Sequence, residues 1–139
     1  MKIILLLLCF AVTVGAEPLH LSSKEVRKGV LEVVDAQLTA IHEGKYDAAY
    51  ALASVNIQRQ FSEVLFERLI KRGYPALARH ARAEAGLVRD DGEGRAEVIV
   101  SVYDGQDRQT DYRYLVVRQG DEWRINGVVA APLPKRGDT

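Results

Sequence analysis

Apolar side chains in the first half of the chain recur at the spacing of one face of an α-helix. The regular pattern begins after Ser22 and stops at Gly44. Ser22 and Glu25 have the spacing of a capping box, in which the serine hydroxyl accepts from a first-turn amide and the glutamate reaches back. The pattern predicts a long helix whose buried face carries Val26, Val30, Val33, Val34, Leu38 and Ile41.

Two shorter helices are expected next, with a polar link between them. The segment "KYDAAYALAS", residues 45–54, suits a helix, and "VNIQRQF", residues 55–61, is interpreted as the link. Ser62 is placed to cap the next helix. Because Pro75 fixes its own φ and biases Tyr74 away from helix, we expect a break there. The helix before the break has apolar residues at helical spacing: Leu65, Phe66, Leu69 and Ile70.

From about Arg82 the hydrophobic period changes to two, which is typical of strands. Glycine and aspartate cluster between the alternating segments and predict short hairpin turns. Strand "EWRINGVV" is expected to place Arg124, Asn126 and Val128 on the face opposite Trp123. The other face of the three clearest strands carries Ala96, Val98, Val100 and Val102, then Tyr112, Tyr114 and Val116, then Trp123, Ile125 and Gly127.

Helices followed by strands at short spacing indicate an α+β domain. We predict N-terminal helices packed on one face of a curved antiparallel sheet of about four strands, joined as a meander. Trp123 and Ile125 on the last strand help to close the core, so the strand near the end of the sequence is paired.

The N-terminus has the pattern of a secretory signal. Lys2 precedes an apolar run, and Val14, Gly15 and Ala16 are small enough for a signal peptidase. We predict a signal peptide over residues 1–16, one domain over 17–131 and a flexible tail over 132–139. The apolar run is shorter than the roughly 20 residues of a membrane-spanning helix, so no stable membrane anchor is expected after cleavage. The protein is then exported, into the periplasm if the source is a Gram-negative bacterium.

Composition excludes several function classes. Cleavage removes Cys9, the single cysteine, so the mature chain offers neither a disulfide nor a thiolate metal ligand. It leaves 18 basic and 19 acidic residues, which gives no electrostatic reason to expect nucleic acid. His20, His42 and His80 lack metal-ligand spacing, so neither a metal nor another cofactor is predicted. His80 lies in a basic segment that we expect to be exposed.

Several short segments together carry a family resemblance. They are "VDAQLTAI", "YDAAYALAS", "IQRQF", "F..LIKRGYPAL" and "WRINGV", in an order and spacing that run from about Val26 to Val129. The sequence resembles a bacterial family called domain of unknown function 4864, and more broadly the nuclear transport factor 2-like superfamily. The superfamily resemblance implies a cone in which helices cover a bent sheet. The narrower family implies no activity.

A cone of this type often holds a pocket between helices and sheet. Enzymes of the superfamily, such as ketosteroid isomerase and scytalone dehydratase, use carboxylate or histidine bases with tyrosine donors there. This chain offers no convincing acid–base pair, so no catalytic residue is assigned. Each candidate for ligand contact also has a purely structural interpretation. Gln37 would make a hydrogen bond to the backbone, and the aromatic residues would pack in the core or across strands. The candidate pocket-lining residues are Gln37, Gln58, Tyr74, Tyr103, Tyr112, Tyr114 and Trp123.

Three function classes follow from the sequence. The first is a non-catalytic exported module that binds a small apolar ligand in the cone, or a protein partner through the sheet. The second is a homo-oligomeric assembly protein, a homodimer through the exposed sheet face. The third is an isomerase-like or dehydratase-like enzyme. A pocket lined by two buried ionisable groups would favour the enzyme, whereas a filled cone would favour packing or assembly.

Overall fold

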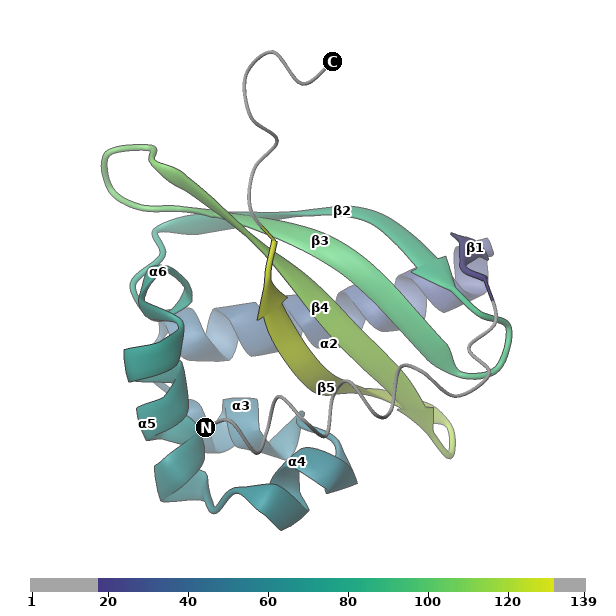
Figure 1. The fold of residues 1–139 in the computed structure, drawn as a ribbon, viewed down its shortest axis with the longest axis horizontal. Helices are drawn as coiled ribbons and strands as arrows, with labels where there is room; N and C mark the ends of the chain where they lie inside the picture. The colour runs from purple at the N-terminus through teal and green to yellow at the C-terminus, as the bar shows by residue number, and fades with distance from the viewer. Residues whose placement is uncertain (1–17, 132–139) are drawn as a thin grey trace.

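The computed structural model describes residues 18–131. The predicted signal peptide and tail therefore lie outside the described residues. A short strand comes first, then helices, then four long strands (Figure 1). The elements in order are β1 (His20–Leu21), α2 (Lys24–His42), α3 (Tyr46–Ala51), α4 (Val55–Gln60), α5 (Glu63–Gly73), α6 (Pro75–Ala78), β2 (Arg82–Asp90), β3 (Arg95–Tyr103), β4 (Gln109–Gln119) and β5 (Glu122–Ala130).

The long helix α2 forms as its apolar spacing predicts, but a different serine caps it. The cap is Ser23, whose side chain accepts a hydrogen bond from the Val26 amide. The expected capping role of Ser22 is wrong, because its hydroxyl donates to the Asp90 carboxylate in strand β2. Gly44 adopts a φ of 73° just after the helix, a conformation that glycine reaches without steric cost.

The segment expected to be a polar link is helix α4. Ser54 begins it by accepting from the Ile57 amide, and the same hydroxyl donates to Asn126 Oδ1 at 2.7 Å. The backbone of Ser54 also donates to the Ile125 carbonyl. The sequence did not predict this helix, because a contact with strand β5 fixes its start. Ser62 caps helix α5 as expected, by accepting from the Leu65 amide, and the break at Tyr74 separates α5 from α6.

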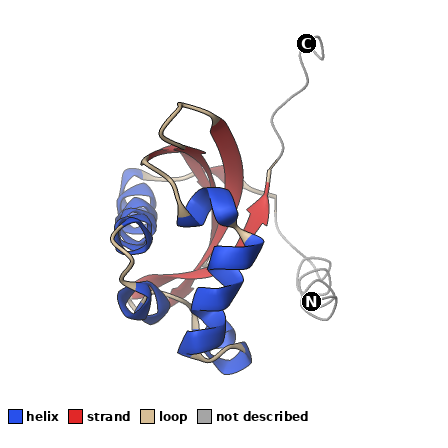
Figure 2. Cartoon of the chain, turned by 90° about the vertical axis from the view of Figure 1, so that its left-hand side faces the viewer, coloured by secondary structure: helices blue, strands red, loops and turns tan. Residues whose placement is uncertain are grey.

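The sheet is fully antiparallel in the order β1-β2-β3-β4-β5. The four predicted strands are present, and β1 adds a fifth by pairing His20 with Asp90. The sheet twists across α2, which lies against both β2 and β5 (Figure 1). Figure 2 shows the helices gathered on one side of the sheet, so the domain has a helical layer and an outer sheet face that no helix of residues 18–131 covers. Within residues 18–131, no helix combines the length and apolar character needed to cross a membrane.

A β-bulge changes which side chains of β5 face the helices. Leu115 pairs with Gly127 and Val116 pairs with Ile125, so Asn126 has no partner on β4. Beyond the bulge the alternation is offset by one residue. Val128 therefore pairs with Tyr114 and packs against the core, contrary to the strict alternation expected from the sequence.

Candidate functional site

The space between helices and sheet is occupied by core side chains. The expected face of α2 meets the expected faces of β3 and β4, and Val30, Val34, Val100 and Tyr114 have no exposed surface. Phe66, Ile70 and Leu77 close the same core from α5 and α6. The inner faces predicted from periodicity for α2, β3 and β4 are confirmed by this burial. On β5 the predicted face holds at Ile125 but is wrong at Gly127, because the bulge places Gly127 opposite Leu115.

Three of the predicted site residues make packing or backbone contacts in this interior. Gln37 is buried, and its amide donates to the Ala49 carbonyl at 3.4 Å. The Tyr74 hydroxyl donates to the Val128 carbonyl at 2.6 Å. The Trp123 ring lies against Gly29 of helix α2. Each contact ties a helix, or the end of one, to another part of the fold.

Tyr74, Tyr112 and Tyr114 form a group where the end of the helical layer meets the sheet. The rings of Tyr74 and Tyr112 have centroids 5.7 Å apart. Helix α6 has no side-chain cap of its own. The backbone amides of Ala76 and Leu77 act to lower the pKa of the Tyr112 hydroxyl, against the larger effect of burial. Burial raises the pKa of Tyr74 and of Tyr112.

Tyr114 differs from its two neighbours because its hydroxyl has no hydrogen-bond partner among the described residues. The side chain is fully buried, and burial raises its pKa. An unpaired buried hydroxyl is costly relative to an apolar group of the same shape. The ring, rather than the hydroxyl, therefore accounts for its contribution to the core.

Gln58 and Tyr103 lie away from the interior. Gln58 is exposed on α4 and donates to the Tyr50 carbonyl. Tyr103 is on the outer face of β3, where the Arg82 guanidinium stacks 3.7 Å from its ring centroid. The seven predicted residues are therefore not one constellation, since two of them do not face the helix–sheet interface.

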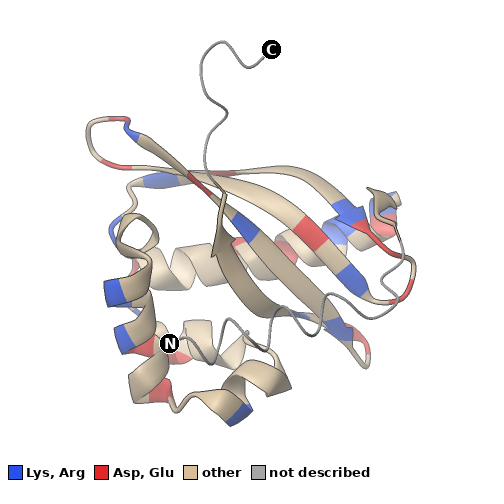
Figure 3. Ribbon diagram, viewed as in Figure 1, with Lys and Arg blue, Asp and Glu red and all other residues tan. Residues whose placement is uncertain are grey.

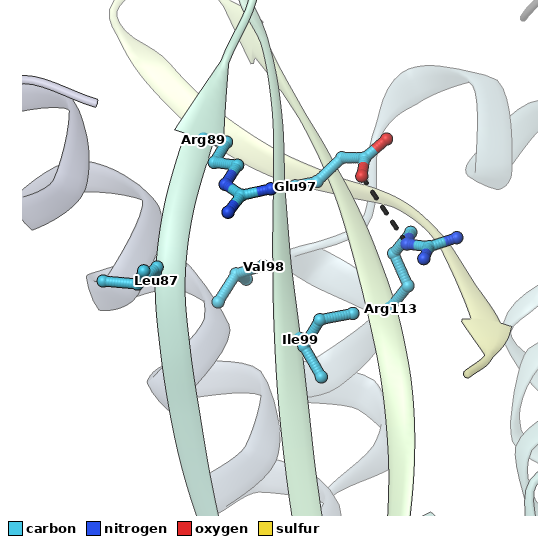
Figure 4. A pocket seen from close by; sticks show the side chains of 6 residues that line it. All are labelled: Leu87, Arg89, Glu97, Val98, Ile99 and Arg113. Carbon is cyan, nitrogen blue, oxygen red and sulfur yellow. Dashed lines mark ion pairs between the residues drawn. The ribbon is translucent and has the colours of Figure 1, made fainter. Parts of the chain in front are cut away.

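The outer face of the sheet carries a groove that the sequence did not predict. Its volume is about 300 Å³, and it runs across strands β2, β3 and β4 (Figure 4). Leu87 and Ile99 form its apolar part, with the Leu87 side chain 65% exposed. The lining residues are Leu87, Arg89, Glu97, Val98, Ile99 and Arg113.

A second β-bulge places Leu87 in this groove. Ala85 pairs with Val100 and Val88 with Val98, so Gly86 and Leu87 together stand opposite the single residue Ile99. A glycine that interrupts an alternating segment is the sequence signal for such a bulge. Gly86 in "AEAGLVRD" carried that signal, but the exposure of the following leucine depends on the pairing with β3.

Charged side chains flank the apolar part of the groove. Arg113 Nε lies 3.5 Å from Glu97 Oε1, and both side chains are substantially exposed. Arg89 stands directly across from Glu97 in the sheet register, yet it makes no ion pair among the described residues. Figure 4 labels Arg89 on β2, Glu97 on β3 and Arg113 on β4, and Figure 3 shows both basic and acidic positions on these strands. The groove thus has two cations and one anion.

The buried histidine and the buried carboxylate do not meet at one site. His80 is only 6% exposed, so the expectation that it is exposed is wrong; its Nδ1 lies 2.7 Å from the Leu77 carbonyl. Asp90 is buried and accepts from Ser22 and the Gly92 amide. The two residues lie at opposite ends of strand β2. In the described part of the chain, no group of three histidine, cysteine or acidic side chains could hold a metal ion.

The family model described as Domain of unknown function (DUF4864) matches residues 23–137. The chain belongs to this family. The match confirms the resemblance seen in the short motifs between Val26 and Val129. Among curated proteins, no match is found. Because the family description names no activity, the function has to be argued from the groove and from the filled interior.

Proposed function

We propose that the protein is an exported, non-catalytic binding module that contacts a protein partner through the outer face of its sheet. The observation that carries this proposal is the groove across β2, β3 and β4, in which the exposed Leu87 lies between charged side chains. Exposed apolar surface rimmed by polar groups is typical of interaction sites. Export is proposed from the signal-like residues 1–16.

The size and openness of the groove favour a protein over a small apolar ligand. Small-molecule sites usually enclose most of their ligand and have volumes of roughly 300–1,000 Å³. This groove is at the lower end and lies open on a sheet face. It suits one or two side chains of a partner whose other contacts spread over the neighbouring strands. The space between α2 and the sheet also disfavours a small ligand, because core side chains occupy it.

The cone of the nuclear transport factor 2-like superfamily is the fold that we propose for this architecture. Its support is the chain order, with helices before an antiparallel meander, and the position of α2 across one sheet face. In this architecture, the outer sheet face is the one that the described helices leave uncovered.

A homodimer through the same face is the second candidate. Leu115 and Val117 are partly exposed on the outer face, where Val117 pairs with Arg124 in the register. A face that mixes apolar and charged groups can be self-complementary. The same experiment distinguishes a second copy from a different partner.

Site-specific photo-crosslinking in the native host tests the proposal. The photoreactive residue p-benzoylphenylalanine replaces Leu87 on the outer face, or Val64 on α5 as a control with matched exposure of 65% and 66%. We expect a discrete crosslinked protein at position 87 and none at position 64. A product of twice the chain's own mass would assign the face to self-association. Equal labelling at both positions, or none at either, would overturn the proposal.

A further inference from the structure

We infer that the outer-face groove recognises an acidic side chain that stands next to an aliphatic side chain on the partner protein. This inference rests on the proposed function and specifies the chemistry of its ligand.

The charge of the groove calls for an anion. Glu97 and Arg113 form an ion pair and largely neutralise each other. Arg89 is exposed and has no ion pair within residues 18–131, so the groove as a whole is left with one positive charge. A guanidinium can bind a carboxylate through two parallel hydrogen bonds. An acidic side chain entering beside Arg89 would therefore gain a partner that the folded chain does not supply.

The apolar part of the groove adds a second requirement. Leu87 projects from the bulge of β2, and Ile99 lines the same groove from the neighbouring strand β3. Figure 4 shows Val98 between the two side chains. An aliphatic side chain placed on these two residues removes apolar surface from water on both partners. Because the arginine and the leucine belong to the same strand, two residues apart, the acidic and the aliphatic group must also be close together on the partner.

Binding of model peptides tests this chemistry without knowledge of the natural partner. The probe is a fluorescein-labelled peptide of eight alternating glutamate and leucine residues, titrated by anisotropy with the chain as its host produces it. One comparison peptide has lysine in place of glutamate, and another has serine in place of leucine. Decanoate is a fourth probe, because it joins a carboxylate to an aliphatic chain outside a protein. We expect binding of the glutamate–leucine peptide alone, weakened by added salt.

Substitutions in the groove, compared with substitutions on helix α5, show whether the peptide binds at the groove. Arg89→Gln and Leu87→Ser should each weaken binding of the glutamate–leucine peptide by about tenfold. The controls Arg68→Gln and Val64→Ser change exposed residues of α5 and should leave affinity within about twofold. Thermal melts of all four variants establish that each is folded.

Three results would overturn the inference. They are equal binding of the lysine peptide, equal binding of decanoate, and an unchanged affinity of folded Arg89→Gln. If crosslinking at position 87 captures a partner while the glutamate–leucine peptide does not bind, the acidic–aliphatic chemistry is wrong and the partner-binding role stands. If crosslinking fails as well, both are wrong.

Discussion

The indole ring of Trp123 lies directly over Gly29 of helix α2. A β-carbon on Gly29 would come within 2.7 Å of Trp123 Cδ1, closer than real β-carbons approach a neighbouring heavy atom. The single tryptophan of the chain and a glycine near the start of its longest described helix are therefore matched in shape. This contact explains a glycine at a position where intrinsic helix propensity disfavours it.

The variant Gly29→Ala should destabilise the protein by roughly 1–3 kcal/mol, because the added methyl group displaces the indole. This effect opposes the gain of about 1 kcal/mol that alanine brings to a helix interior. Urea unfolding measures the difference. Gly73→Ala is the matched control, since its β-carbon would meet only Leu69 Cδ1 at an ordinary 3.6 Å. A stabilised Gly29→Ala variant would show that the ring moves aside freely.

Truncating the other partner, in Trp123→Ala, should cost about 3 kcal/mol. That value is the lower end of the range for large aromatic residues, because Trp123 is only partly buried. Calorimetry compares the melting temperature of this variant with that of Val64→Ala, which truncates an exposed residue and should lower the melting temperature less. Arg124→Ala is no neutral control, although the residue faces away from the core. Its guanidinium donates to the Ala51 carbonyl at the end of α3, at 2.6 Å. An unchanged melting temperature of Trp123→Ala would argue for a recognition role of the ring.

Two tyrosine-to-phenylalanine variants should differ in stability although both residues lie in the core region. Tyr114→Phe removes a buried hydroxyl without a partner in the described chain, so we expect it to be neutral or stabilising. Tyr74→Phe removes the donor to the Val128 carbonyl and should cost about 1–2 kcal/mol. Chemical unfolding of both proteins gives the comparison. Equal losses would mean that the Tyr114 hydroxyl has a partner after all.

Stability should decline in alkaline solution. Burial raises the pKa of Tyr46, Tyr74, Tyr112 and Tyr114. Unfolded tyrosines lose their protons near pH 10, while the folded chain still holds them. The stability from these groups is therefore complete below about pH 10 and is lost as pH rises through the folded pKa values. Each group contributes a slope of up to about 1.4 kcal/mol per pH unit.

Urea midpoints between about pH 9 and about pH 11.5 measure this decline. Tyr114→Phe should flatten it, because one of the groups that must ionise on unfolding is gone. A midpoint that stays constant or rises across this range would contradict the sign of the prediction.

Asn126→Ala should destabilise the protein by about 1–2 kcal/mol, because it leaves the hydroxyl of the fully buried Ser54 without its acceptor. Asn56→Ala is the matched control. Asn56 is exposed, and its amide is 3.5 Å from the same Asn126 oxygen. Hydrogen exchange of the α4 amides would locate the effect, since Ser54 caps that helix. Equal stability of both variants would show that the cap forms without Asn126.

Periodicity in the sequence determined the element types and the faces that they bury. The valines of α2 and the alternating residues of β3 and β4 fall where predicted, because both periods follow from local backbone geometry. Short-range turn chemistry determined the hairpins in the same way. The α+β class and the family are thus readable from the sequence alone.

Tertiary structure decided what depends on the pairing of distant segments. The bulge opposite Leu115 and Val116 turns Val128 toward the core, and the bulge in β2 turns Leu87 outward. Ser54, which caps α4, donates a hydrogen bond to Asn126 on β5, and the short strand β1 forms by pairing His20 with Asp90. Register between strands is a relation between two segments, whereas alternation is a property of one. For that reason the sequence identified the inner faces of β3 and β4, and only the folded chain reveals the face of β5 beyond its bulge and the groove on the outer side of the sheet.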